Sequence, residues 1–246
     1  MAGNQEIIYA STHLGGEKCP PTPDHSQGYV WPIYDTYDIF VANLKGEITA
    51  KLNLVEVYYD IGDKEAYEES LNDVLSIDVE IDNPEWEGEI HLLEGRLALL
   101  HYDYTKAKLA LTKAREIADR LDYGHLKINV SIEIGRMQRL QGLLSPAVDT
   151  LQQTIDDPDL ALEGLAGLVA YIELAKACLS LEQDVKAHTV LSQAIALLDE
   201  NSSDHPKFRQ QVYELMSICL ERQQNFEPAY LYLQRSSGLK ETIRHQ

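Results

Sequence analysis

Residues 93–118 have the sequence LEGRLALLHYDYTKAKLALTKAREIA, and their order of small and bulky residues decides the fold. Gly95 is followed twelve residues later by Ala107, and Leu111 comes four residues after that. The triplet recurs about every 40 residues: first at Val55, Gly95, Gly135, Ala175 and Ser217, next at Tyr67, Ala107, Ala147, Ala187 and Ala229, and last at Leu71, Leu111, Leu151, Leu191 and Leu233. A fixed period of roughly 20–50 residues is typical of stacked repeats.

Each repeat is predicted to be a pair of helices. Gly95 has no side chain, so a neighbouring helix can approach it closely. The run Asp103–Lys106 is expected to make the turn, and Ala107, Leu111 and Ala114 then lie on one helical face. In the next unit Pro146 is compatible with the first turn of the second helix.

This arrangement resembles the tetratricopeptide repeat (TPR) family, over roughly residues 46–244. The first family position falls at Ile48, Gly88, Ile128, Leu168 and Gln210. The period is longer than the usual TPR unit of about 34 residues, and in this it is similar to TPR arrays of bacterial signalling proteins such as MalT-type regulators and diguanylate-cyclase sensors. Residues 49–75 also resemble the cytoplasmic C-terminal repeat of FimV-type pilus-assembly hubs. The resemblance implies an all-α, right-handed superhelical solenoid of about five helix pairs.

The two ends of the chain differ from the repeats. Residues 1–30 are expected to form an irregular arm, because residues 11–30 are rich in Gly, Pro and Ser. Residues 31–45 are predicted to form a helix that covers the first repeat, and residues 46–246 the repeats themselves. The last predicted helix has no cover of its own, so a further domain or subunit is expected to cover that C-terminal face.

The formal net charge is −19, and it is unevenly distributed. Residues 31–89 hold 16 acidic and three basic residues, a net of −13. Such a field disfavours binding to nucleic acid and to anionic lipid, and it attracts basic partners. Two interpretations stay open for this acidic quarter: solubility alone, or the docking of a basic protein partner.

One basic series follows the repeat period. The ninth position of the first helix, which faces the concave groove in the family, is Glu56, Arg96, Arg136, Lys176 and Ile218. The candidate partner-binding residues are Arg96, Arg136, Arg139, Lys176, Glu56, Asn53 and Asn129. The alternative is local pairing, because Glu133 stands three residues before Arg136 and Glu173 three before Lys176. Arg96 has no acidic residue three or four positions away, and is therefore expected to be the cation that is free to bind a ligand.

No other chemistry is predicted. The eight histidines form no zinc motif, and no nucleotide-binding or hydrolase motif occurs, so we expect no cofactor, no metal and no enzymatic activity. Cys19, Cys178 and Cys219 are expected to be reduced thiols of a cytoplasmic protein. No apolar run is long enough to span a membrane.

The sequence therefore predicts a non-enzymatic protein-interaction module that binds a peptide or helix of a partner in its groove. It would serve as a scaffold or regulatory part of a bacterial assembly. The alternative is a ligand-sensing TPR domain of a larger signalling protein, such as a cyclase or a transcription regulator.

Overall fold

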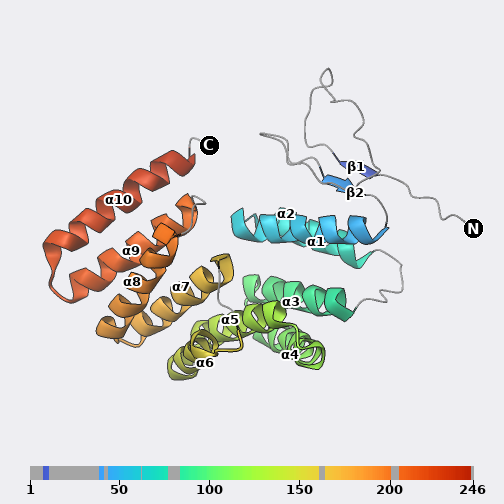
Figure 1. The fold of residues 1–246 in the computed structure, drawn as a ribbon, viewed down its shortest axis with the longest axis horizontal. Coiled ribbons are helices and arrows are strands. Elements are labelled where there is room, and N and C mark those ends of the chain that lie inside the picture. Colours follow the sequence, from blue (N-terminus) through green and yellow to red (C-terminus); the bar gives the residue numbers. More distant parts are fainter. Residues whose placement is uncertain are drawn as a thin grey trace, which may run out of the picture. The chain divides into compact units, whose positions relative to one another are not determined.

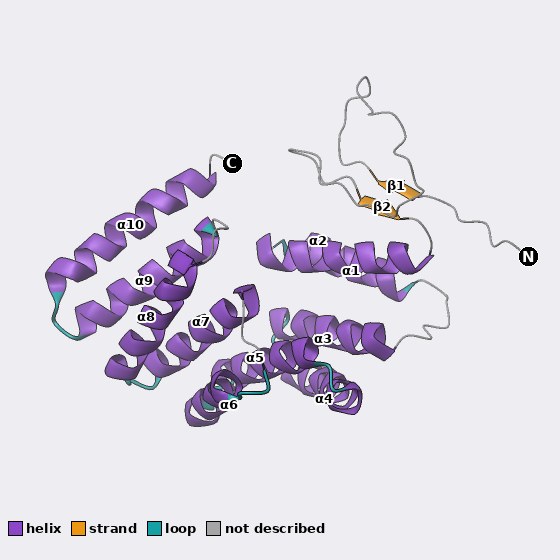
Figure 2. Ribbon diagram, viewed as in Figure 1, coloured by secondary structure: helices purple, strands orange, loops and turns teal. Residues whose placement is uncertain are grey.

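The computed structural model describes residues 8–10, 39–41, 44–61, 63–76, 84–160, 164–200 and 205–244 (Figure 1). Nearly all of these residues are helical (Figure 2). The helices are α1 (Leu44–Ile61), α2 (Lys64–Leu75), α3 (Pro84–Leu100), α4 (Tyr104–Leu121), α5 (Gly124–Leu140), α6 (Leu144–Asp156), α7 (Gly164–Ser180), α8 (Asp184–Glu200), α9 (Pro206–Arg222) and α10 (Phe226–Arg244).

The chain divides into two compact units, Met1–Glu80 and Ile81–Gln246. The first unit holds α1, α2 and two short strands, β1 (Ile8–Ala10) and β2 (Ile39–Val41), which pair antiparallel with Tyr9 opposite Phe40. We predicted a covering helix over residues 31–45, and this prediction is wrong for residues 39–41, which form the strand β2. Ile39 and Val41 are β-branched and flank an aromatic residue, a composition that favours a strand. The described part of α1 begins at Leu44. Residues 31–38, and most of the predicted arm, lie outside the described residues.

Repeat one, in the first unit, packs around a tyrosine. Tyr67 occupies the position where the other units carry alanine, yet its side chain is fully buried, as are Leu71 and Val55. Its ring lies 5.6 Å from that of Tyr59, centroid to centroid. Two aromatic rings therefore fill this space in repeat one, whereas in the other repeats the two helices carry small residues here and lie closer together.

The turn inside each helix pair has the same geometry in all four repeats of the second unit. One residue in each turn has a positive φ: Tyr102, Gly142, Glu182 and Gln224. The next residue donates its backbone N–H to a carbonyl five residues earlier, as in Asp103 to Ala98 (2.9 Å) and Leu143 to Gln138 (2.8 Å). This is the hydrogen bond that ends a helix at a left-handed residue. The repeat period is therefore visible in the backbone itself.

The predicted close crossings are confirmed. A Cβ built on Gly95 would lie 2.7 Å from Leu111 Cδ2, and one on Gly135 would lie 2.5 Å from Leu151 Cγ. Each glycine thus lets the third member of its own triplet pack directly on the helix backbone, α4 on α3 and α6 on α5. Pro146 is the third residue of α6, as predicted.

Asp157 precedes Pro158, a pair that is typical of a helix start, but here it does not cap a helix. Asp157 follows the last residue of α6, and its side chain accepts a hydrogen bond from the backbone N–H of Asp159 at 3.0 Å. This local turn satisfies the carboxylate within the loop, and α7 begins only at Gly164.

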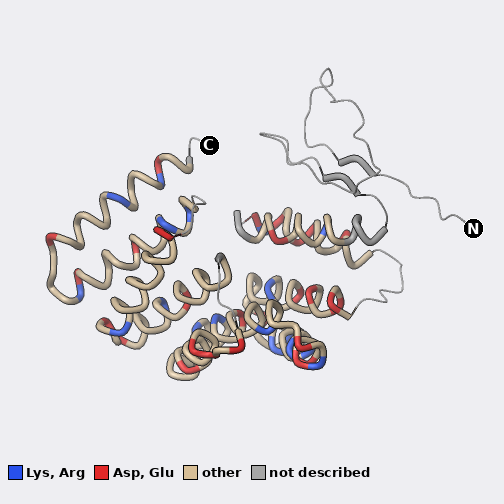
Figure 3. Tube along the Cα trace, viewed as in Figure 1, with Lys and Arg blue, Asp and Glu red and all other residues tan. Residues whose placement is uncertain are grey.

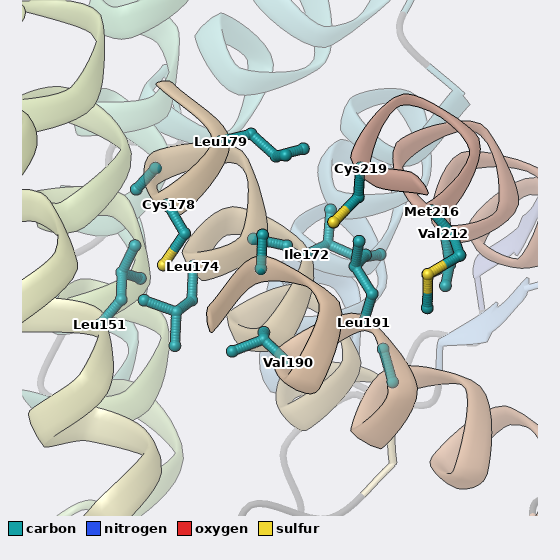
Figure 4. Close-up of a cluster of buried hydrophobic side chains, with 14 of the residues drawn as sticks. Leu151, Ile172, Leu174, Cys178, Leu179, Val190, Leu191, Val212, Met216 and Cys219 are labelled. Carbon is teal, nitrogen blue, oxygen red and sulfur yellow. The ribbon is translucent and has the colours of Figure 1, made fainter. Parts of the chain in front are cut away.

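Buried apolar side chains run continuously from α6 to α10 (Figure 4). The cluster includes both described cysteines, Cys178 and Cys219, which are unpaired and buried. Burial raises the pKa of the Cys178 thiol and raises that of Cys219 to about 11. Both side chains therefore pack in the hydrophobic core, their reduced state stays a prediction, and Cys19 lies outside the described residues.

In the second unit the first helices of successive repeats form one layer. Neighbouring helices in the chain pack together, and α3 also contacts α5, α5 contacts α7, and α7 contacts α9. We call these four helices the odd-helix layer. Among the described residues, no helix combines the length and the apolar character needed to cross a bilayer.

Candidate functional site

A row of charged side chains crosses the odd-helix layer from α3 to α7. Figure 3 marks the helices that carry these basic and acidic positions. The row consists of Arg96 on α3, Glu133, Arg136 and Arg139 on α5, and Glu173 and Lys176 on α7. We call these six residues the charged row.

The first link joins α3 to α5. Arg96 Nε donates to Glu133 Oε1 at 2.9 Å, and both side chains are buried. Arg136 Nη1 donates to both oxygens of the same carboxylate, at 3.2 and 3.1 Å. Glu133 is therefore clasped between a cation of the preceding repeat and one of its own.

The second link joins α5 to α7. Arg136 Nη2 donates to Glu173 Oε1 at 3.3 Å, and Arg139 Nη2 donates to Glu173 Oε2 at 3.0 Å. Lys176 Nζ donates to Glu173 Oε1 at 2.8 Å. Three cations thus surround one carboxylate.

The row is buried on one side and open on the other. Only 1% of the Glu133 side chain and 2% of the Glu173 side chain are exposed, but Arg136, Arg139 and Lys176 are 18, 20 and 24% exposed. The carboxylates therefore lie beneath the cations, which keep part of their surface toward solvent.

The electrostatics follow from this geometry. Burial by itself would raise the pKa of Glu173, since it disfavours the charged form. The positive charges of Arg136, Lys176 and Arg139 outweigh burial and hold the pKa of Glu173 well below its ordinary value of 4.5. Glu173 is therefore ionised at neutral pH.

The structure corrects one premise about Arg96. We expected it to lack an acidic partner, because no acid stands three or four residues away in its own helix. That expectation is wrong: Glu133 of the next repeat, 37 residues further on, pairs with it. The two local pairs, Glu133 with Arg136 and Glu173 with Lys176, are confirmed.

The remaining candidates lie on α5 and α1. Asn129 lies on α5, two turns before Arg136, and its side-chain amide contacts the ring of His125 at 3.4 Å. Asn53 and Glu56 lie on α1 in the first unit, where Asn53 is exposed and Glu56 half-buried. The sequence analysis missed the role of Glu133 and Glu173 in bridging repeats. The signal was present as the 37-residue spacing of each cation from the next acid.

Within the residues that the structure describes, no group of three or more His, Cys, Asp or Glu side chains is placed to hold a metal ion.

Comparisons with known proteins bear on the fold. No protein-family model and no curated protein sequence matches the chain. Solved structures do: BtubC from P. vanneervenii is 14% identical, with a TM-score of 0.61 over 82% of each chain. A Podosopora anserina putative kinesin light chain with nearly identical TPR-like repeats is 18% identical, with a TM-score of 0.53 over 81% of this chain and 98% of that one. PilW, a type IV pilus biogenesis factor, is 15% identical, with a TM-score of 0.55 over 79% and 78%.

At these identities the likeness is one of fold. The chain is a TPR-like helical solenoid, and the fold class predicted from the triplet pattern is confirmed. The described residues form five helix pairs, α1–α2 through α9–α10.

Proposed function

We propose that this chain is a non-enzymatic protein-interaction module that binds a peptide or helix of a partner protein on its odd-helix layer. The observation that carries the proposal is the charged row, where three partly exposed cations lie over a buried carboxylate. Solenoids of helix pairs offer extended surfaces that suit binding.

The repeat position of the cations supports this surface. Arg96, Arg136 and Lys176 share the ninth position of their repeats, and in α9 the same position is Ile218, which is 38% exposed. An exposed isoleucine on α9 and partly exposed cations on α5 and α7 give this layer both apolar and charged side chains. Interfaces commonly combine an apolar centre with charged groups around it.

The role in a bacterial assembly, as scaffold or regulatory part, belongs to the same proposal. It is supported by the likeness of the fold to that of PilW, which is described as a type IV pilus biogenesis factor. The proposal includes a cytoplasmic location for the protein.

A photo-crosslinking experiment tests which layer binds. A photoreactive amino acid replaces Ile218 on α9 or Leu140 on α5, and, as matched controls, Leu109 on α4 or Val185 on α8. All four side chains are at least one-third exposed. A discrete crosslinked product is expected from the first two positions and from neither control. Products from the α4 and α8 positions alone would contradict the proposal.

A ligand-sensing module is the second candidate. The observation that favours it is that Glu133 and Glu173 tie successive repeats together through cations on two helices each. A ligand that drew those cations away would alter the links between repeats. Amide hydrogen exchange of α3, α5 and α7, measured with and without the partner that crosslinks to the odd-helix layer, distinguishes the two roles. A scaffold is expected to show unchanged exchange rates beyond the contact surface. A sensor is expected to show faster exchange in all three helices.

A further inference from the structure

The cations around Glu173 outnumber the negative charge they share. Arg136, Arg139 and Lys176 all donate to this one carboxylate, and Arg136 also serves Glu133. Arg139 and Lys176 both pair with Glu173, so one buried negative charge is set against more than one positive charge. This part of the charged row therefore has an excess of positive charge, although the chain as a whole has a net charge of −19.

The geometry leaves donors available on the open side. A guanidinium carries five N–H donors in a rigid fork, and an ammonium carries three. Arg139 uses Nη2 on Glu173, while its Nε is buried and has no hydrogen-bond partner among the described residues. Because that Nε is closed to solvent, a ligand can reach only the exposed part of the Arg139 side chain, which is 20% of its surface.

Carboxylate is the chemistry that best completes this arrangement. Arginine pairs with carboxylate through two parallel hydrogen bonds, and lysine adds a point charge beside it. Glu173 shows that the same three side chains already converge on a carboxylate, from beneath. A ligand carboxylate that approached Arg139 and Lys176 from their solvent-exposed side would meet cations that the buried Glu173 already holds in place.

We propose that the odd-helix layer binds an acidic peptide segment, whose Asp or Glu side chains pair with Arg139 and Lys176 over Glu173. This inference rests on the proposed function, in which the odd-helix layer binds a protein partner, and it names the class of that partner. Nucleic acid is disfavoured, since its binding needs a long run of clustered cations and this row belongs to a strongly acidic chain.

The test uses a fluorescein-labelled hexaglutamate peptide with an amidated C-terminus, so that only side-chain carboxylates are present. Fluorescence anisotropy with the full chain measures its affinity at low salt and at 0.15 M salt. A hexaglutamine peptide of the same length is the matched probe. Hexaglutamate is expected to bind, more weakly as salt rises, and hexaglutamine is not.

Variants locate the contact. Arg139→Gln and Lys176→Gln are each expected to weaken hexaglutamate binding about tenfold, which corresponds to roughly 1.4 kcal/mol. Lys176→Arg keeps the charge and is expected to retain binding. Lys108→Gln on α4 and Lys240→Gln on α10 remove exposed cations elsewhere in the same unit and are expected to leave binding unchanged. Circular dichroism melting of every variant separates lost binding from lost folding.

Three results would overturn the inference. Equal weakening by Lys108→Gln would mean that the peptide senses only general charge. Competition by inorganic phosphate at the same concentration as free hexaglutamate would indicate a simple anion site. Failure of hexaglutamate to bind, together with crosslinks from Ile218 and Leu140, would reject the acidic class and leave the proposed function standing.

Discussion

Glu173→Gln tests how much the charged row contributes to folding. The substitution keeps the shape of the side chain and removes the negative charge that Arg136, Arg139 and Lys176 share. Breaking a fully buried ion pair costs about 3–5 kcal/mol, because the remaining charge stays desolvated. The three cations here are 18–24% exposed and can regain some water. We therefore expect a loss of about 2–4 kcal/mol at pH 7.

The pH dependence supplies a second measurement. The folded pKa of Glu173 lies below its unfolded value, so its contribution is fully present above about pH 4.5 and is lost as pH falls through the folded pKa. The gap in stability between the natural chain and Glu173→Gln should therefore be constant from pH 5 to 7. It should narrow progressively as pH drops below about 4.5.

Tryptophan fluorescence gives an assay confined to the second unit. The chain has two tryptophans, Trp31 and Trp86, and Trp86 lies on α3. In a Trp31→Phe background, urea unfolding followed by Trp86 reports on residues 81–246. Glu116→Gln on α4, where the side chain is exposed, is the matched control and should change stability by less than about 0.5 kcal/mol. A loss for Glu173→Gln no larger than this control would refute the reasoning.

Four other predictions follow from the fold and its charges. Gly135→Leu should cost about 1–3 kcal/mol by overpacking Leu151, whereas Gly238→Leu on the open side of α10 should be tolerated; equal melting temperatures would count against the crossing. Gly142→Ala should lower the free energy of unfolding by about 1–2 kcal/mol because the φ of Gly142 is +77°, whereas Gly124→Ala should be tolerated because there is open space around Gly124. The midpoints of urea unfolding measure both changes, and an unchanged midpoint for Gly142→Ala would contradict the prediction. In a Cys19→Ser chain, Cys178 and Cys219 should react with a thiol reagent at pH 8 only as fast as the protein unfolds, since both are buried with raised pKa; rapid reaction would show that they are accessible. Neutralising Glu65, Glu68, Glu69 and Asp73 on α2 should slow association with a basic partner more than it speeds dissociation, and salt-independent association would favour the solubility interpretation.

The helix pairs could be predicted from the sequence because their causes are local. Gly95 and Leu111 meet within one unit, and the 40-residue period repeats the same local solution. The pairs Glu133–Arg136 and Glu173–Lys176 follow from helical geometry alone.

The features that sequence analysis missed depend on tertiary context. The pairing of Arg96 with Glu133 requires the stacking of one repeat on the next, which no rule about spacing within a helix can supply. The strand at Ile39–Val41 depends on its partner Ile8–Ala10, about 30 residues away in the chain. Asp157 and Pro158 have the sequence of a helix start, but the hydrogen bond from the backbone N–H of Asp159 holds Asp157 in a local turn instead.

The charged row also shows where the layer changes character. Arg96 to Glu133 and Arg136 to Glu173 are both spaced by 37 residues, so each ninth-position cation reaches the acid at the sixth position of the next unit. In the last unit, which starts at Gln210, the sixth position is Leu215, which carries no charge, and the row ends at α7.

In α9 the ninth position becomes the exposed Ile218. One end of the layer thus offers cations held by buried carboxylates, and the next helix offers an apolar side chain. A partner that lies along the layer has to present acidic residues toward α5 and α7 and an apolar residue toward α9. This order favours one direction of binding for such a segment, because the reverse orientation would place a carboxylate on Ile218 and an apolar residue on Arg139 and Lys176.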